Sequence, residues 1–334
     1  MINSNFIISE INDLHIPRVV ELWNKTCNKN FLYKPFKEET FKEKFVDSSY
    51  FRCSRNYVCL LNNEVVGFAN GVYRKELLPG EKYEDIPGYI TIIIVKDDKK
   101  GLGIGRALVE KLEKYLKNEG KNKVRVDFFN PTSLPWYIPN SLRHDHPNAP
   151  GVDIEGEGYE FFKKLGYIER TKEVSMYRTL KEFVLGERIK EREEELNKNG
   201  IVIQYYNKSK HYGLEEFFHN LKNEYWRKDI FNNLSLEKPY PFFIAAHNGK
   251  VCGFAGPLQV EKSGRGLFCG IGVEPNYEGK GIGKLLFFKL CEGFKKEGAE
   301  FMSLFTDING NARKMYADAG FKVIRTWALF EREV

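Results

Sequence analysis

The sequence lacks any long hydrophobic run. Even the apolar stretch Thr91-Ile-Ile-Ile-Val95 is far shorter than the ~20 residues that a helix needs to cross a bilayer, and its pattern is typical of a buried strand. The N-terminus lacks the charged segment and apolar core of a signal peptide. Cysteine is scarce: six residues are scattered without a Cys-x-x-Cys pair. These absences favour a cytoplasmic location with reduced, buried thiols.

Charge of one sign is not concentrated anywhere. The 52 Lys and Arg are interleaved with 46 Asp and Glu, which leaves a formal net charge of +6. We therefore expect a solvated surface of mixed charge and no nucleic-acid or membrane partner. The 26 Phe and 18 Tyr indicate well-packed globules, and 334 residues are enough for two domains.

What the sequence does contain is a strand, a glycine-rich turn and a helix, and it contains them twice. One copy is Val273-Glu-Pro-Asn-Tyr-Glu-Gly-Lys-Gly-Ile-Gly-Lys284, and the other is Val95-Lys-Asp-Asp-Lys-Lys-Gly-Leu-Gly-Ile-Gly-Arg106. The valine and the second glycine are eight residues apart in both copies. Glycines at a helix N-terminus let successive backbone N–H groups converge on a phosphate or pyrophosphate. Two matched units indicate a tandem duplication.

The order of the predicted elements also repeats. In the first half we expect a strand at 6–11, helices at 15–26 and 38–47, a hairpin at 57–61 and 65–73, a strand at 89–95, a helix to about 118 and a strand at 123–129. In the second half we expect a strand at 201–206, a hairpin at 242–246 and 251–255, strands at 267–273 and 301–305, and a helix from about 311. Each half should close with a strand pair, at about 168–179 and 322–332.

These patterns predict an N-terminal domain at 1–180, a charged connecting helix at 181–200 and a C-terminal domain at 201–334. One segment breaks the repeat, because Gly105 to Gly166 spans 61 residues whereas Gly283 to Gly320 spans 37. The extra residues lie at about 131–154, in a stretch rich in proline. A loop of this length inside a domain is usually a lid or an interface, and a surface insert without function is the alternative.

Three nucleotide-binding patterns compete for the glycine loops. The dinucleotide fingerprint needs a third glycine or alanine three positions after the second, and neither loop has one there. The Walker loop needs Ser or Thr after its lysine, and neither loop provides it. What remains is Lys100-x-x-Gly103-x-Gly105 and Glu278-x-x-Gly281-x-Gly283.

This remaining pattern, with a strand before and an amphipathic helix after, resembles the acetyl-CoA loop of the GNAT acyltransferase superfamily. The segment Asn309-x-x-Ala312-x-x-x-Tyr316-x-x-x-Gly320-Phe321 is similar to the second motif of that family. The layout resembles that of tandem acetyltransferases of the mycothiol synthase type. The resemblance implies an α/β (α+β) chain of two tandem GNAT folds, each a mixed, mostly antiparallel central sheet flanked by helices. Glu278 departs from the Arg or Gln usual at its position.

The resemblance further implies acetyl-CoA as cofactor, held by backbone donors of each strand and loop. The expected cofactor-binding residues are Ile93, Ile94, Val95, Gly101, Leu102, Gly103, Ile104, Gly105, Arg106, Ile271, Gly272, Val273, Gly279, Lys280, Gly281, Ile282, Gly283, Lys284 and Asn309. By the same resemblance Tyr316 is the catalytic general acid that protonates the leaving thiolate. A tyrosine whose ring merely packs beneath the sheet is the alternative.

The first half departs from this motif. Phe162 stands where the second half has Tyr316, and Glu155 where it has Asn309, so we expect the chemistry in the second half. Tyr159, one turn earlier, is a weak substitute. The general base is left open: Asp307 and Glu274 are possible, and each is otherwise a solvated loop charge.

Three other sequence patterns are weaker evidence of function. His144-Asp145-His146 lacks an evident third ligand, so no metal is expected. The acidic cluster Asp153, Glu155, Glu157 and Glu160 either attracts a cationic amine or is a solvated helix start. Cys269 is expected to be a buried thiol and not a nucleophile.

The leading hypothesis is therefore an acetyl-CoA-dependent N-acetyltransferase that acts on a small amine or aminoacyl acceptor, as a monomer or homodimer. A non-catalytic acyl-CoA-binding or scaffold protein is the alternative, because the first half is degenerate. A transferase that uses aminoacyl-tRNA would predict degraded loops and a basic groove, and both loops here are intact.

Overall fold

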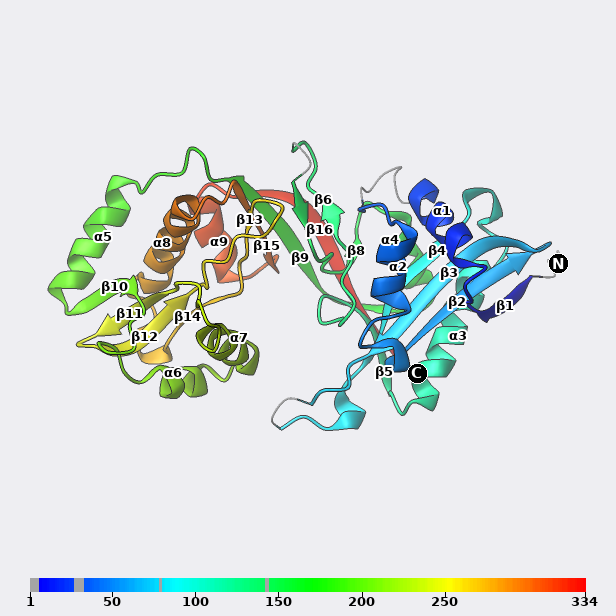
Figure 1. Ribbon diagram of the computed structural model, residues 1–334, viewed down its shortest axis with the longest axis horizontal. Helices are drawn as coiled ribbons and strands as arrows, with labels where there is room; N and C mark the ends of the chain where they lie inside the picture. Colours follow the sequence, from blue (N-terminus) through cyan, green and yellow to red (C-terminus); the bar gives the residue numbers. More distant parts are fainter. Residues whose placement is uncertain (1–5, 27–32, 78–79, 142–143) are drawn as a thin grey trace. The chain divides into compact units, whose positions relative to one another are not determined.

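The computed structural model describes residues 6–26, 33–77, 80–141 and 144–334 (Figure 1). The chain packs as two compact units, one made of Met1–Val174 with Arg325–Val334 and the other of Ser175–Ile324. This division differs from the boundaries expected from the sequence in two places. The segment 181–200 falls within the second unit, and the last ten residues fall within the first.

The first unit holds most of the elements expected of its half, within a few residues of the predicted bounds. They are β1 (Ile7–Glu10), α1 (Ile16–Thr26), α2 (Glu38–Phe45), β2 (Ser54–Leu61), β3 (Glu64–Tyr73), β4 (Gly88–Val95), α3 (Ile104–Asn118), β5 (Lys123–Val126), β6 (Trp136–Tyr137), β7 (Asp145–His146), β8 (Val152–Asp153) and α4 (Glu157–Lys164). Single 3₁₀ turns lie at Phe51–Cys53, Tyr83–Asp85 and Asp97–Lys99.

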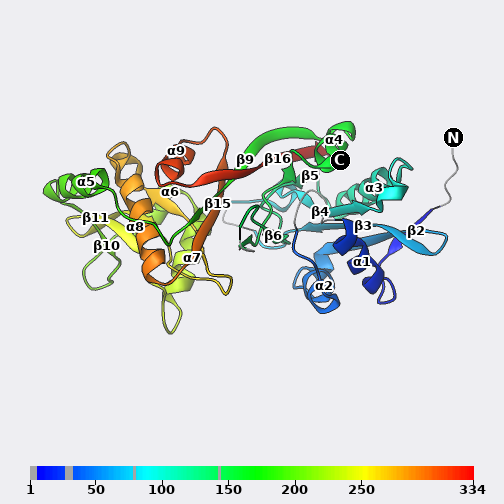
Figure 2. The same ribbon diagram turned by 90° about the horizontal axis from the view of Figure 1, so that it is seen from above.

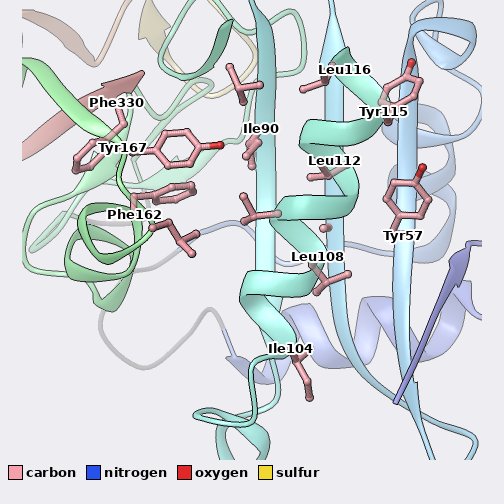
Figure 3. Packing of buried hydrophobic residues seen from close by; sticks show 14 of the residues in the cluster. Tyr57, Ile90, Ile104, Leu108, Leu112, Tyr115, Leu116, Phe162, Tyr167 and Phe330 are labelled. Atoms are coloured by element: carbon pink, nitrogen blue, oxygen red, sulfur yellow. The ribbon is translucent and has the colours of Figure 1, made fainter. Parts of the chain in front are cut away.

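Helices cover both faces of the first unit's sheet (Figure 2). Strands β1 to β4 are antiparallel neighbours, β5 runs parallel to β4, and β16 is antiparallel to β5. Helix α3 packs on one face through a row of residues that includes Leu108 and Leu112 (Figure 3). Helices α1 and α2 pack on the other face through residues such as Trp23 and Phe41. The apolar stripe at helical spacing is thus what buries each face of the sheet.

The second unit repeats this layering. Its elements are α5 (Glu187–Lys198), β10 (Ile201–Tyr205), α6 (Leu214–Leu221), α7 (Glu224–Leu234), β11 (Phe243–His247), β12 (Lys250–Ala255), β13 (Arg265–Gly266), β14 (Ile271–Val273), α8 (Ile282–Lys296), β15 (Phe301–Asp307) and α9 (Asn311–Asp318), with a 3₁₀ turn at Pro275–Tyr277. Strands β10, β11, β12 and β14 pair antiparallel in that order, whereas β13 runs parallel to β15. Helices α6 and α7 cover one face of the antiparallel strands, and α8 covers the other (Figure 1). The predicted fold class, a mixed and mostly antiparallel sheet flanked by helices in each half, is confirmed.

The two units share their irregularities as well as their order. Val66 in β3 and Cys252 in β12 are each an extra residue, because the register with the neighbouring strand shifts at that point. The glycine that follows each of them lies against a helix. A Cβ on Gly67 would come within 3.1 Å of Leu108, and a Cβ on Gly253 within 3.0 Å of Leu286. The close approach of helix to strand explains why Gly-Phe-Ala occurs at both places.

Two strands contribute residues to both units. β9 (Ile168–Thr179) begins in the first unit and ends in the second, and β16 (Lys322–Glu333) begins in the second and ends in the first. We expected a pair of strands at each place, and this expectation is wrong because each is one unbroken strand. The end of β16 pairs with β5, and Phe330 lies in the first unit's core. The last residues of the chain thus complete the first sheet.

The insertion interrupts a strand. In the second unit β15 is continuous, whereas in the first the matching strand is split into β5 and β8, and both pieces pair with β16. Their register is continuous along β16, from Phe330↔Val126 to Ala328↔Val152 and Trp327↔Asp153. The two registers differ by 24 residues, so the insertion lies within 127–151, whereas the sequence placed it at about 131–154. This is also why the strand predicted at 123–129 ends at Val126.

Removing the Phe330 ring tests whether the end of β16 supports the first unit. Phe330→Ala should lower the free energy of unfolding of this unit by about 3–5 kcal/mol, because the ring is 0% exposed and its loss leaves a cavity. Amide hydrogen exchange should show lost protection in β5. Val323→Ala, at a 42% exposed position of the same strand, is the control and should change stability by less than ~0.5 kcal/mol. Unchanged exchange of β5 in Phe330→Ala would contradict the pairing.

Candidate functional site

The two glycine loops have the same backbone conformation. Each follows a strand and a single 3₁₀ turn, and each ends in a helix of 15 residues. Four glycines have positive φ at matched positions: Gly101 (81°), Gly103 (83°), Gly279 (75°) and Gly281 (79°). An L side chain is strained at these φ values, which accounts for glycine at all four places.

Each loop ends at an uncapped helix N-terminus. The N-cap residues of α3 and α8 are Gly103 and Gly281, and among the described residues no side chain accepts a hydrogen bond there. The first intrahelical bonds run from Ala107 N to Gly103 O (3.0 Å) and from Leu285 N to Gly281 O (3.1 Å). The N–H groups before these bonds have no partner within the helix, so they and the positive end of the helix dipole point to where an anion would be stabilised.

Each unit contains a parallel strand pair that ends after two residue pairs. β4 pairs with β5 only at Gly88 and Tyr89 within the described chain, and β13 pairs with β15 only through Arg265 and Gly266. Beyond these pairs, the edge of β4 from Ile90 to Val95 is bonded to β3 on one side and open on the other. An open strand edge offers backbone donors and acceptors to a ligand. Ile93 to Val95, the expected pantetheine-binding residues, lie on this edge.

A β-bulge marks the point where β4 separates. Asn70 pairs with Ile92 and Gly71 with Ile90, which leaves Thr91 as the extra residue. The bulge shifts the alternation of side chains, so Ile90 packs with the α3 cluster whereas Ile92 packs with α1 and α2. The residue pattern of this strand does not predict the bulge.

A cavity of about 450 Å³ opens beside the unpaired edge of β4 in the first unit. Its lining comes from β4, the first loop, the start of α4, the region of Trp23 and Tyr33, and the end of β5 at Val126. Leu134 and Gly151 of the insertion and Val152–Asp153 of β8 complete it. Its size suits a small molecule. From the sequence, the insertion was either a lid or interface or a surface insert without function. In the structure it forms part of the cavity wall.

The second unit differs at the strand that precedes its loop. The predicted strand 267–273 is not continuous, because residues 267–270 separate β13 from β14. Trp226 of α7 packs on this break, and a Cβ on Gly270 would lie 2.4 Å from its indole nitrogen. The expected binding residues Ile271 to Val273 form β14, which pairs with β12.

The charges beside the two loops have different origins. In the first loop Lys100 forms ion pairs with Asp97 (2.7 Å) and Glu157. In the second loop Glu278 stands at the matching position, and the cation comes from another helix. Arg192 of α5 lies so close that a Cβ on Gly281 would be 3.2 Å from its Nε. Sequence reasoning missed Arg192, because nothing in the charged segment 181–200 indicates which residue faces the loop.

Tyr316 is buried in the second unit. Its side chain is 4% exposed, and its ring centroid lies 4.6 Å from that of Phe287 on α8 and 5.9 Å from that of Phe268. Phe268 belongs to the break between β13 and β14, so Tyr316 lies beside the point where the parallel strands separate. In the first unit Phe162 is a core residue, and the hydroxyl of Tyr159 donates to Glu169 (2.8 Å).

The other expected site residues of the second unit are held by local contacts. Asn309 is exposed, and its backbone N–H donates to the carboxylate of Asp307 (2.7 Å). The buried carboxylate of Glu274 accepts a hydrogen bond from Asn220 (2.9 Å). These contacts do not assign the role of general base to Asp307 or to Glu274, and both remain predictions.

The acidic cluster of the first half does not form one surface. Asp153 is 8% exposed and paired with Arg325, and burial raises the pKa of its carboxyl. Glu155 is exposed, Glu157 binds Lys100, and Glu160 binds Lys163. Only Asp153 and Glu157 of the four line the cavity.

The described part of the chain contains no group of three or more His, Cys, Asp or Glu side chains placed to hold a metal ion. Asp145 of the His-Asp-His segment is instead paired with Lys34. Within the same residues, none of the helices is both long and apolar enough to span a bilayer.

Comparison with known proteins identifies the family. The sequence profile described as "Acetyltransferase (GNAT) family" matches residues 16–137 and 207–321, which together are more than two thirds of the chain. The chain therefore belongs to the GNAT family. An uncharacterized N-acetyltransferase of Methanocaldococcus jannaschii is 28% identical over 124 residues, a stretch that covers 34% of this chain and 54% of that protein.

Solved structures with the same fold include tandem proteins. A GCN5-related N-acetyltransferase from Sphaerobacter thermophilus is 14% identical with a TM-score of 0.62, and the match covers 100% of this chain and 97% of that one. A tandem GNAT protein from the clavulanic acid biosynthesis pathway is 13% identical with a TM-score of 0.57, over 98% of both chains. A glucosamine N-acetyltransferase region of a fungal multi-domain protein is 15% identical with a TM-score of 0.72, over 99% of this chain and 38% of that one. These likenesses confirm the tandem GNAT fold.

The described thiols should be unreactive in the folded protein. Burial raises the pKa of Cys59 and Cys252 to about 11 and that of Cys269 to about 12, so almost none is thiolate at pH 8. We expect these thiols to react with a disulfide reagent at least about 100-fold more slowly in the native protein than after denaturation. The test uses a Cys27→Ser variant, because Cys27 lies outside the described residues. A rapid native reaction of one thiol per chain would contradict the prediction.

Proposed function

We propose that this chain transfers the acetyl group of acetyl-CoA to the nitrogen of a small amine or aminoacyl acceptor. The observation that supports the proposal is the repeated loop: two uncapped helix N-termini, each preceded by glycines in the same left-handed conformation, in units whose parallel strand pair ends after two residue pairs. A non-catalytic scaffold is not favoured, since the family match covers both halves.

The chain's own groups account for the binding of acetyl-CoA. Its diphosphate would accept hydrogen bonds from the first-turn N–H groups of α3 and α8, and the left-handed glycines keep side chains out of the concavity. Lys100 in the first loop and Arg192 beside the second add a cation to each. The pantetheine amides would pair with the open edges of β4 and β14. Bound acetyl-CoA supplies the thioester.

Within this proposal Tyr316 donates a proton to the departing thiolate in the second half. A tyrosine titrates near ~10 and a thiol near ~8.5, so the transfer is uphill by only ~1.5 pKa units and Tyr316 can act as general acid as negative charge develops on the sulfur. The position of Tyr316 beside Phe268, at the parting of β13 and β15, supports this role. The acceptor nitrogen must be neutral to attack the carbonyl carbon.

Placing a carboxylate in the second loop tests the diphosphate site. Gly283→Glu should reduce the acetyl-CoA stoichiometry measured by calorimetry from two sites to one, because the new charge repels the diphosphate. The fold should tolerate the change, because the nearest atom to a Cβ there is 3.6 Å away and an acidic residue suits a helix N-terminus. Gln204→Glu, which adds the same charge at an exposed position of β10, should retain both sites. Equal binding by the two variants would overturn the assignment of this loop.

Removing the Tyr316 hydroxyl tests the proton donor. In a background with Gly103→Val, where a β-branched residue is strained at φ 83° and disables the first loop, Tyr316→Phe should lower kcat by roughly 10²-fold. Acetyl-CoA affinity should stay within about twofold, since the ring and its packing are kept. Release of free CoA thiol with a panel of amines measures the rate. Tyr205→Phe, at an exposed ring of the same unit, is the control; a loss of similar size there would refute the specific role.

A further inference from the structure

Among the described residues that line the cavity of the first unit, one acidic side chain lies in its interior. Its other charged lining residues, Asp97, Lys100 and Glu157, have side chains that are 38–73% exposed and lie at the rim. The side chain of Asp153 is 9% exposed. The remaining lining is mostly aliphatic and aromatic, and it includes Trp23 and Leu134. An apolar chamber with a single buried carboxylate is complementary to a cation that carries an apolar body.

The carboxylate of Asp153 is fixed and still has acceptor capacity. One oxygen accepts from the backbone N–H of Glu155 (3.1 Å), and the other is paired with Arg325. A carboxylate has about four lone-pair positions, so further donors can bind. Arg325 does not line the cavity, so the group that faces a ligand from this pair is the anion.

The insertion holds this wall in place. Trp136 is fully buried, and its indole N–H donates to Asn148 O (3.0 Å). Leu134, which lines the cavity, accepts a backbone hydrogen bond from Ala149 (3.0 Å). The insertion is also tied to the segment after α1, where Lys34 N donates to Pro135 O (2.9 Å). Asn130, near its start, donates to the hydroxyl of the bulged Thr91 (3.0 Å). It is therefore a packed wall of the chamber.

We propose that the first half, although it lacks the tyrosine of the second, holds its own acceptor site: the part of the cavity beside Asp153, next to the β4 edge at which the pantetheine would pair, takes a small primary amine with an apolar body, and Asp153 binds the ammonium group. The apolar wall supplied by the insertion selects the body. The transfer of an acetyl group to this amine rests on the function proposed above, whereas the binding of the amine does not.

The transfer step balances without a further reactant. The ammonium first loses one proton to water, its nitrogen then bonds to the acetyl carbon, and the C–S bond breaks. A second proton leaves the nitrogen, and the thiolate takes up one proton from solvent. The products are the amide, free CoA and one proton. Phe162, at the position of Tyr316, takes no part in these proton transfers.

Ligand binding in the absence of acetyl-CoA tests the proposal separately from catalysis. The probes are 2-phenylethylamine and its neutral analogue 2-phenylethanol, titrated calorimetrically into the full chain. We expect the amine to bind and the alcohol to bind at least about tenfold more weakly, because a charge-assisted contact is lost. Asp153→Asn should weaken amine binding by about tenfold or more. Glu155→Gln removes the same charge at the exposed neighbour and should change binding by less than about twofold.

A second variant keeps the test decisive if Asp153→Asn unfolds because Arg325 is left without its carboxylate. Thr26→Phe places a ring at the edge of the cavity from the last residue of α1 and should abolish amine binding with the ion pair intact. Failure of the amine to bind, equal binding of amine and alcohol, or binding that survives both substitutions would overturn the proposal. Amine binding without CoA release from any acceptor would instead overturn the acetyl transfer alone.

Discussion

The structure depends on a parallel strand pair in each unit that ends after two residue pairs. β4 and β5 share two residue pairs before they separate, and β13 and β15 do the same in the second unit. A continued ladder would have satisfied the backbone groups of Ile90 to Val95 and would have filled the space beside them. Because it stops, each unit has an open strand edge next to an uncapped helix N-terminus. Unpaired backbone groups next to a focused positive dipole are what an extended, anionic cofactor requires.

The two units share this arrangement and differ in what surrounds it. The bulges at Val66 and Cys252, the helix-packed Gly67 and Gly253 and the four left-handed glycines are the same in both units. The strand beside the loop is not: β4 is continuous with one bulged residue, whereas β13 and β14 are separated and Trp226 packs on the gap. The first unit has an insertion that forms part of a cavity wall, and the second has Tyr316 where β13 and β15 separate. A shared backbone with different walls is what two sites with different acceptors would need.

Patterns within short stretches of sequence predicted much of the structure, but they did not predict which distant segments pair. The element order, the backbone of both loops, the existence of the insertion and the burial of four described thiols follow from spacing and composition within short stretches, whereas Cys269, expected to be buried, is half-buried. The split of one strand into β5 and β8 does not, because its proof is a shared register on β16, almost 200 residues away along the chain. Arg192 was missed for the same reason. A residue's neighbours in sequence do not show that it faces a glycine 89 positions later.

Because β9 and β16 each have residues in both units, the structural units of this chain do not coincide with its two sequence repeats. The boundary expected near residue 180 follows the repeat in the sequence, but a fragment ending there would lack Arg325–Val334. β5 would then lose its antiparallel partner, and the core would lose Ala328 and Phe330. Asp153 would also lose Arg325, so the one carboxylate inside the cavity would be unpaired. The acceptor site proposed for the first half thus depends on the last ten residues of the chain, which lie in the second half of the sequence. The first sequence repeat alone therefore does not contain the whole first unit.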